Sequence, residues 1–104
     1  MPEATVMTAA DGIDATAKLA SFMPNLILTD IIMPNMNGAE FVKYIRGTRR
    51  YAKTKVIAIT GLHKEDSRVH DITAAGIEKM VYKPYDDDEM VSSIRETYES
   101  TDVR

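Results

Sequence analysis

The sequence predicts a single α/β domain built on a parallel sheet, and two observations support this. Short apolar runs typical of buried strands alternate with segments whose apolar residues recur at helical spacing. The chain has 104 residues, of which 44% are hydrophobic and 28% charged, so it can bury one core but not two. We therefore expect residues 1–104 to form one domain with a doubly wound parallel sheet of about four strands.

Four apolar runs are the predicted strands. The clearest is Lys55 to Thr60, which is apolar on both faces, as expected of a buried parallel strand. The others lie at Ala4 to Thr8, Asn25 to Thr29 and Lys79 to Tyr82. Proline cannot donate a hydrogen bond to a strand, so Pro84 ends the last one.

A predicted helix follows each strand. Each of these segments has a turn or capping residue at its start and apolar residues at helical spacing. They run from Ile13 to Phe22, from Asn37-Gly38 to Gly47, from about Glu65 to Ala75, and onward from the acidic run Asp86 to Glu89. That acidic run supplies an N-cap and a negative first turn for the final helix.

Charge and cysteine content exclude several kinds of function. The net charge of −3 does not favour binding to nucleic acid or to anionic membranes. The absence of cysteine excludes disulfides, thiolate catalysis and zinc–cysteine sites. The first residues lack the basic and apolar segments of a signal peptide, and no run approaches the length of a membrane span. We expect a cytoplasmic protein that contacts neither nucleic acid nor membrane directly.

Polar side chains stand at the carboxyl ends of three successive predicted strands: Asp30, Thr60 and Lys83. In an open parallel sheet, these ends form the crevice in which ligands bind. An aspartate can be a nucleophile toward a phosphoryl group, while a hydroxyl and an ammonium suit phosphoryl oxygens. Each residue alone has an ordinary structural interpretation, but together they predict a phosphoryl-transfer site.

A joint motif makes this prediction more specific. Asp30 is followed by Met33-Pro34-x-Met36-x-Gly38, the next strand ends in Ile-Thr, and the one after ends in Lys83-Pro84. In this pattern the chain resembles the response-regulator receiver domains of bacterial two-component systems, from about residue 3 to residue 100. The resemblance implies a flavodoxin-like fold and a phosphorelay function. The domain would accept a phosphoryl group from a histidine kinase or phosphotransfer protein, without being an enzyme itself.

The resemblance also implies roles for individual residues. Asp30 would be the phosphoacceptor and, with the Ile32 carbonyl, a Mg²⁺ ligand. Thr60 would be the switch hydroxyl, and Lys83 would bind the phosphoryl group next to a cis Lys83-Pro84 bond. Met80 stands where the family usually has an aromatic residue, and Tyr82 lies nearer Lys83.

The larger departure is at the start, because the family begins with a further strand ending in an acidic pair, followed by a helix. This sequence has neither, through a natural loss, a mis-assigned start or a truncation. With Asp30 as the one acidic ligand, we expect weak or absent Mg²⁺ binding and impaired self-phosphorylation. The alternative is a pseudo-receiver that binds or dimerises without phosphorylation. A flavodoxin-like ligand binder ranks last, because no loop resembles a phosphate cradle.

The missing strand is the central one in the family order 2-1-3-4-5. Its loss would leave a gap of roughly 10 Å between the strands at Val6 and Leu28. The chain could close it by pairing these strands directly, by loosening its N-terminal part, or by borrowing a partner's strand in a swapped dimer. Because direct pairing would displace the helix from Ile13 to Phe22, we expect a homodimer.

Other charged groups receive ordinary interpretations. The basic stretch from Arg46 to Lys55 precedes a strand, so it should lie at the amino-end rim, away from Asp30, as a solvated loop. Asp86 to Asp88 follow the last strand, and a helix cap accounts for them. His63 and His70 lack a third ligand, so we do not expect a metal site there.

Overall fold

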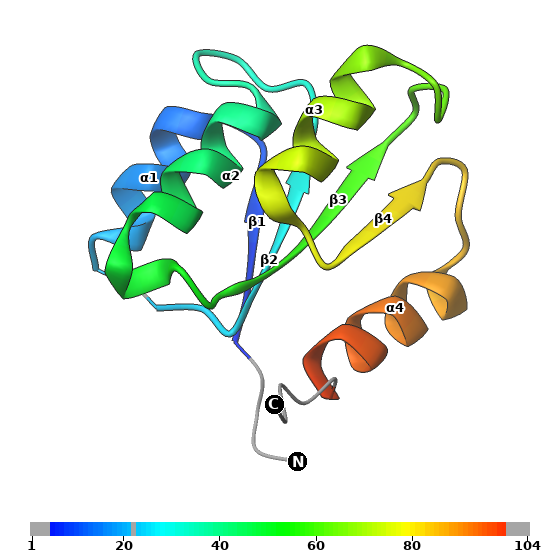
Figure 1. Cartoon of the computed structure of the whole chain (residues 1–104). Coiled ribbons are helices and arrows are strands. Elements are labelled where there is room, and N and C mark those ends of the chain that lie inside the picture. The colour runs from blue at the N-terminus through cyan, green and yellow to red at the C-terminus, as the bar shows by residue number, and fades with distance from the viewer. Residues whose placement is uncertain (1–4, 22, 100–104) are drawn as a thin grey trace.

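The computed structural model describes residues 5–21 and 23–99. Its sheet has four parallel strands in the order β1-β2-β3-β4, which are Val6–Ala9, Leu26–Asp30, Lys55–Thr60 and Lys79–Tyr82. The helices are α1 (Gly12–Leu19), α2 (Gly38–Gly47), α3 (Ser67–Gly76) and α4 (Asp87–Glu99), with a short 3₁₀ turn, η1 (Arg49–Tyr51). Helices α1, α2 and α3 cover one face of the sheet and α4 the other (Figure 1), which confirms the predicted doubly wound α/β fold.

The predicted bounds of α2, β3 and β4 are confirmed, and the other elements begin or end one to three residues from the predicted positions. Helix α3 begins two residues later than predicted because Asp66 is its N-cap and accepts a hydrogen bond from the Arg68 amide. Helix α1 ends at Leu19, earlier than predicted, and Phe22 lies outside the described residues. The prediction that the first strand starts at Ala4 also falls partly outside them.

The predicted gap beside β2 is absent, because β1 pairs with β2 directly and in parallel. The pairing runs from Val6 opposite Leu26 to Ala9 opposite Thr29. Helix α1 packs beside α2, and the hydroxyl of Tyr51 in η1 donates to the Leu19 carbonyl of α1 at 2.6 Å. Direct pairing is therefore compatible with a packed α1, and β1 occupies the edge of β2 that strand exchange would have filled.

The sheet separates a large core from a small one. The large core lies between the sheet and α1, α2 and α3, around side chains such as Leu19, Ile27 and Phe41. The small core consists of Leu26, Ile57 and Val81 covered by α4. Because α4 contacts mainly β3 and β4, no helix that the structure describes covers the same face of β1, and Val6 is 38% exposed.

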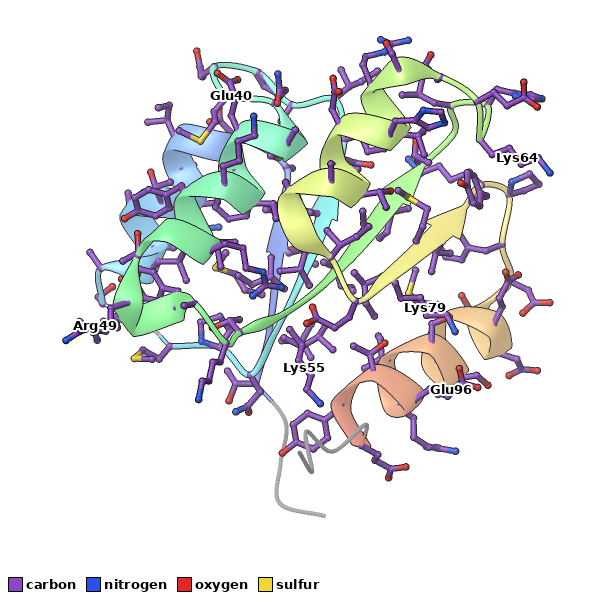
Figure 2. The ribbon with its side chains drawn as sticks, viewed as in Figure 1. Glu40, Arg49, Lys55, Lys64, Lys79 and Glu96 are labelled. Atoms are coloured by element: carbon purple, nitrogen blue, oxygen red, sulfur yellow. The ribbon has the colours of Figure 1, made fainter. Side chains whose placement is uncertain are left out.

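Lysines on two strands hold the C-terminal half of α4 against the sheet. Lys55 Nζ donates to the carbonyls of Thr97 and Tyr98 at 2.9 and 3.3 Å. An ammonium stabilises these carbonyls at a helix C-terminus, where the helix dipole is negative. Lys79 Nζ donates to Glu96 Oε1 at 2.8 Å and lowers the pKa of that carboxyl. Figure 2 shows Lys55, Lys79 and Glu96 between the sheet and this helix.

Arg46 is a structural residue rather than part of a solvated loop, which corrects the sequence-based interpretation. Its guanidinium donates to the carbonyls of Gly76, Ala52 and Thr54 at 2.8, 2.9 and 2.6 Å, and to Glu78 Oε1 at 2.9 Å. These contacts tie the end of α2 to the end of α3 and to the segment entering β3.

We predict that Arg46→Met lowers the free energy of unfolding by about 2 to 3 kcal/mol, because hydrogen bonds to charged groups contribute about that much when partly buried. Urea denaturation measures the change. Lys43→Met, an exposed substitution on the same helix, is the matched control and should stay within about 0.5 kcal/mol of wild type. Equal stability of the two variants would contradict the role assigned to Arg46.

Candidate functional site

The strand register brings the three predicted site residues to one edge of the sheet. Asp30 lies opposite Ile59, and Thr60 lies opposite Tyr82. Asp30, Thr60 and Lys83 consequently line one open cleft of about 270 Å³. Ile32, the other residue that the resemblance implicates, lines it as well. The convergence expected from the sequence is present.

Lys83 faces Asp30 across this cleft. Its Nζ lies 3.5 Å from Asp30 Oδ1, although 53 residues separate the two in the chain. The Lys83-Pro84 bond is cis, as the resemblance implies, and the Lys83 amide donates to the Thr60 carbonyl at 2.7 Å. The side chains of Lys83 and Asp30 are 51% and 42% exposed, so a reagent from solvent can reach the carboxylate.

Thr60 is only 4% exposed, yet it lines the cleft. Its Oγ1 accepts a hydrogen bond from the Leu62 amide at 2.9 Å. A hydroxyl that accepts one bond still has its own hydrogen to donate. Met80 packs against the large core, whereas Tyr82, opposite Thr60, is 39% exposed.

The loop after Asp30 depends on a glycine. The Gly38 amide donates to the Ile31 carbonyl at 2.7 Å, and Asn37 caps α2 in a capping box with Glu40. A Cβ atom on Gly38 would lie 2.6 Å from the Asp30 carbonyl oxygen and 2.9 Å from Ile31 Cα. Only glycine permits this close approach between the start of α2 and the backbone that carries the carboxylate.

Two supports of this loop are not evident from the sequence. Thr29 is fully buried, and its hydroxyl donates to the Asp30 carbonyl at 3.0 Å. Asn35 has a positive φ of 69° and donates from Nδ2 to Asp11 Oδ2 at 3.0 Å. In the sequence, these supports are indicated only by a threonine within an apolar strand and by an asparagine, a residue that tolerates left-handed backbone.

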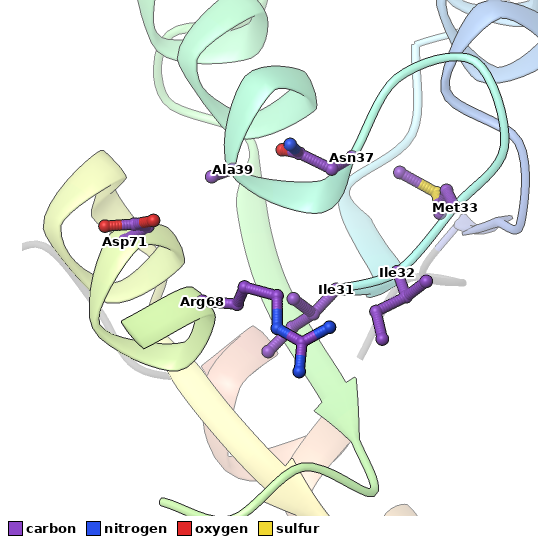
Figure 3. A pocket seen from close by; sticks show the side chains of 7 residues that line it. All are labelled: Ile31, Ile32, Met33, Asn37, Ala39, Arg68 and Asp71. Carbon is purple, nitrogen blue, oxygen red and sulfur yellow. The ribbon is translucent and has the colours of Figure 1, made fainter. Parts of the chain in front are cut away.

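A second, smaller hollow adjoins the cleft between the β2–α2 loop and α3 (Figure 3). It has a volume of about 150 Å³, and Ile31 and Ile32 line both hollows. Figure 3 shows the Arg68 side chain reaching from α3 toward Ile31. Arg68 donates to both Asp66 carboxylate oxygens, at 2.9 and 2.8 Å, and these hydrogen bonds lower the pKa of Asp66 to about 2.

The oxygen donors at the cleft are few. Of the carboxylates that the structure describes, Asp30 alone lines it, and Asp86 accepts the Glu89 amide as a helix cap instead. Across residues 5–21 and 23–99, no cluster of three His, Cys, Asp or Glu side chains could hold a metal. Magnesium prefers octahedral oxygen coordination centred on carboxylates. This donor set does not fit a resident Mg²⁺ ion, so the chemistry below uses protein groups alone.

Comparison with known proteins identifies the family. Residues 2–95 match the response regulator receiver domain family. The chain belongs to this family. It is 38% identical over 87 residues to the Regulator of RpoS of Escherichia coli (strain K12), and this alignment covers 81% of this chain and 24% of that protein. It is 31% identical over 94 residues to Protein PilG of Pseudomonas aeruginosa, covering 86% of this receiver chain and 66% of PilG.

Solved receiver structures confirm the flavodoxin-like fold. The chemotaxis response regulator CheY4 of Vibrio cholerae aligns with a TM-score of 0.77 and 28% identity, over 86% of this chain and 73% of CheY4. The receiver domain of sensor histidine kinase PA1611 from Pseudomonas aeruginosa PAO1 aligns with a TM-score of 0.78 and 22% identity, over the same shares. That domain holds a magnesium ion in its active site cleft.

The receiver chain spans only part of its curated relatives. It is 30% identical over 89 residues to the Hybrid signal transduction histidine kinase D of Dictyostelium discoideum. This alignment covers 86% of this chain but only 6% of that protein. Among the described residues, every helix is too short or too polar to cross a bilayer.

We predict that Gly38→Ala lowers the free energy of unfolding by about 1 to 3 kcal/mol, because its methyl group overlaps the Asp30 backbone. Gly47→Ala is the matched control, since nothing lies within 4 Å of a Cβ there. It should raise stability by up to about 1 kcal/mol. Thermal denaturation of both variants measures the change in stability. An unchanged stability of Gly38→Ala would show that the loop can accommodate a Cβ atom at this position.

Proposed function

We propose that this receiver domain is a phosphoacceptor in a two-component phosphorelay, with Asp30 taking a phosphoryl group from a histidine kinase or phosphotransfer protein. One observation supports this above all. The Lys83 ammonium lies 3.5 Å from the Asp30 carboxylate in a cleft that Thr60 also lines. The proposal includes a cytoplasmic location, the compartment that the sequence predicts.

The proposed transfer needs little covalent work from the protein. An Asp30 oxygen attacks phosphorus in line with the P–N bond of a phosphohistidine, and that bond breaks as the O–P bond of the acyl phosphate forms. The imidazole leaves with the electron pair of the broken bond and takes a proton from solvent. Lys83 neutralises charge on the phosphoryl oxygens, and the Thr60 hydroxyl donates to one of them.

We further propose that Mg²⁺ binds this chain weakly or not at all, at Asp30 and the Ile32 carbonyl, and that self-phosphorylation is impaired. A phosphoryl group carries more negative charge than one ammonium offsets. The transition state is stabilised by cationic groups placed around the phosphoryl oxygens, and here Lys83 is the cation that faces Asp30.

The small donor set also favours a second candidate, a pseudo-receiver that binds or dimerises without phosphorylation. In that case Lys83 would serve as a permanent counter-ion of Asp30. The two candidates differ in whether Asp30 acquires a phosphoryl group at all.

We predict slow phosphorylation confined to Asp30 when the protein is incubated with acetyl phosphate, with or without MgCl₂. Intact-mass spectrometry should show a partial gain of one phosphoryl group in wild type and none in Asp30→Asn. Asp87→Asn, which removes an exposed carboxylate from the start of α4, is the control and should label like wild type. Labelling that survives Asp30→Asn would overturn the proposal. Complete absence of labelling from both acetyl phosphate and a phosphohistidine donor would select the pseudo-receiver.

We also propose that the receiver chain forms a homodimer, now through the open face and free edge of β1. β1 is an edge strand, and Val6 on it is 38% exposed. Exposed strand edges and apolar faces favour association.

Sedimentation equilibrium at micromolar concentration should show a dimer for wild type and a monomer for Val6→Glu, because the charge would be buried at the interface. Ile13→Glu, on α1, introduces the same charge at a residue that is 53% exposed and should remain dimeric. A compact wild-type monomer that unfolds cooperatively would rule out this dimer.

A further inference from the structure

A basic hollow lies at the end of the sheet opposite Asp30. It has a volume of about 450 Å³ and is lined on one side by Arg49, Arg50 and Lys53, and on the other by Met23, Pro24 and Asn25. Asn25 precedes β2, so the hollow is at the amino ends of the strands. Figure 2 shows Arg49 at this end of the molecule. The intervening strand β3 has six residues, or about 20 Å at 3.3 Å per residue.

The cations around this hollow have no carboxylate partner among residues 5–21 and 23–99. Among the described residues, no ion pair involves Arg49, Arg50 or Lys53. By contrast, each of several other basic residues has an acidic partner, namely Lys18, Arg46, Arg68, Lys79 and Lys83. Three like charges therefore gather on one five-residue segment of a chain whose net charge is −3. Their mutual repulsion would be relieved by a bound anion.

Arg50 is held in place without losing its charge. Its Nε donates to Met23 Sδ at 3.0 Å, and its Cζ lies 5.8 Å from the centroid of the Tyr51 ring. Both contacts leave the remaining guanidinium hydrogens free to bind an oxyanion. A positioned guanidinium binds a carboxylate with two parallel hydrogen bonds.

The hollow also has an apolar part, which indicates the kind of anion. Met23 is 48% exposed and lines the hollow together with the buried Pro24. A bare inorganic anion would leave the Met23 side chain uncovered. A peptide with an apolar side chain between acidic ones would cover it while its carboxylates meet the arginines.

The charge of the whole chain favours a short ligand over a nucleic acid. A duplex extends far beyond one hollow and would meet the net negative surface around it. At physiological salt, charges beyond about 8 Å are largely screened. A short segment confined to the hollow therefore interacts mainly with the three cations.

We propose that this hollow binds a short acidic peptide segment of a partner protein, in which carboxylates flank an apolar residue. Arg49, Arg50 and Lys53 are exposed, as the sequence-based interpretation of a solvated loop expects, and the proposal adds a ligand for these exposed cations. The site lies away from Asp30, so the proposal stands whether or not Asp30 is phosphorylated.

Fluorescence anisotropy with a labelled Glu-Glu-Leu-Asp-Glu peptide tests the proposal. We expect saturable binding that weakens with added salt, and no binding of the matching Gln-Gln-Leu-Asn-Gln peptide. In the triple variant R49Q/R50Q/K53Q the affinity should fall about tenfold or more, since each exposed ion pair contributes a factor of about two to five. If the triple variant does not fold, R49Q/K53Q, which keeps the contacts of Arg50 with Met23 and Tyr51, should lower the affinity about four- to 25-fold.

The matched control is K43Q/K64Q/R95Q. It removes the same charge from three exposed residues that form no ion pair with any described residue. Its affinity should stay within about twofold of wild type. Equal losses in both triple variants would show general charge attraction and overturn the proposal. Absence of binding at millimolar peptide would overturn it too, as would tighter binding of pyrophosphate or of a duplex DNA oligonucleotide.

Discussion

Direct parallel pairing of β1 with β2 is the contact on which the rest of this receiver domain depends. Side chains alternate between the faces of a strand, so the register decides which residues enter which core. With Val6 opposite Leu26, Met7 and Ala9 face the large core, while Val6 stays on the open face. The pairing also keeps α1 beside α2, and it leaves β1 as an edge strand.

The parallel alignment of the strands also determines where the reactive side chains lie. Because all strands are parallel, their carboxyl ends share one edge, where Asp30 and Lys83 meet, and their amino ends share the other. Around Asp30 the backbone is fixed by the Thr29 hydroxyl and by the glycine at position 38. The result is an accessible carboxylate facing one ammonium, which suits a phosphoryl acceptor. Among the described residues, no further carboxylate of the kind that Mg²⁺ prefers lines this cleft.

Local patterns predicted much of this, and long-range packing explains what they missed. The strands at Lys55–Thr60 and Lys79–Tyr82 and the convergence of Asp30, Thr60 and Lys83 follow from apolar runs and their polar ends. The pairing of β1 with β2 does not follow from such local patterns, because it depends on whether α1 can remain packed. Arg46 seemed solvated because its acceptors at Gly76 and Glu78 lie 30 and 32 residues away.

The proposed action of Lys83 on the phosphoryl group at Asp30 can be tested by comparing rates of phosphoryl transfer. The rate of Asp30 labelling by a phosphohistidine donor would be measured for Lys83→Met and for Lys43→Met, which removes an exposed lysine from α2. We expect Lys83→Met to slow transfer about tenfold or more, because a charge-stabilising group is lost, and Lys43→Met to match wild type. Equal rates in both variants would contradict the proposed action of Lys83.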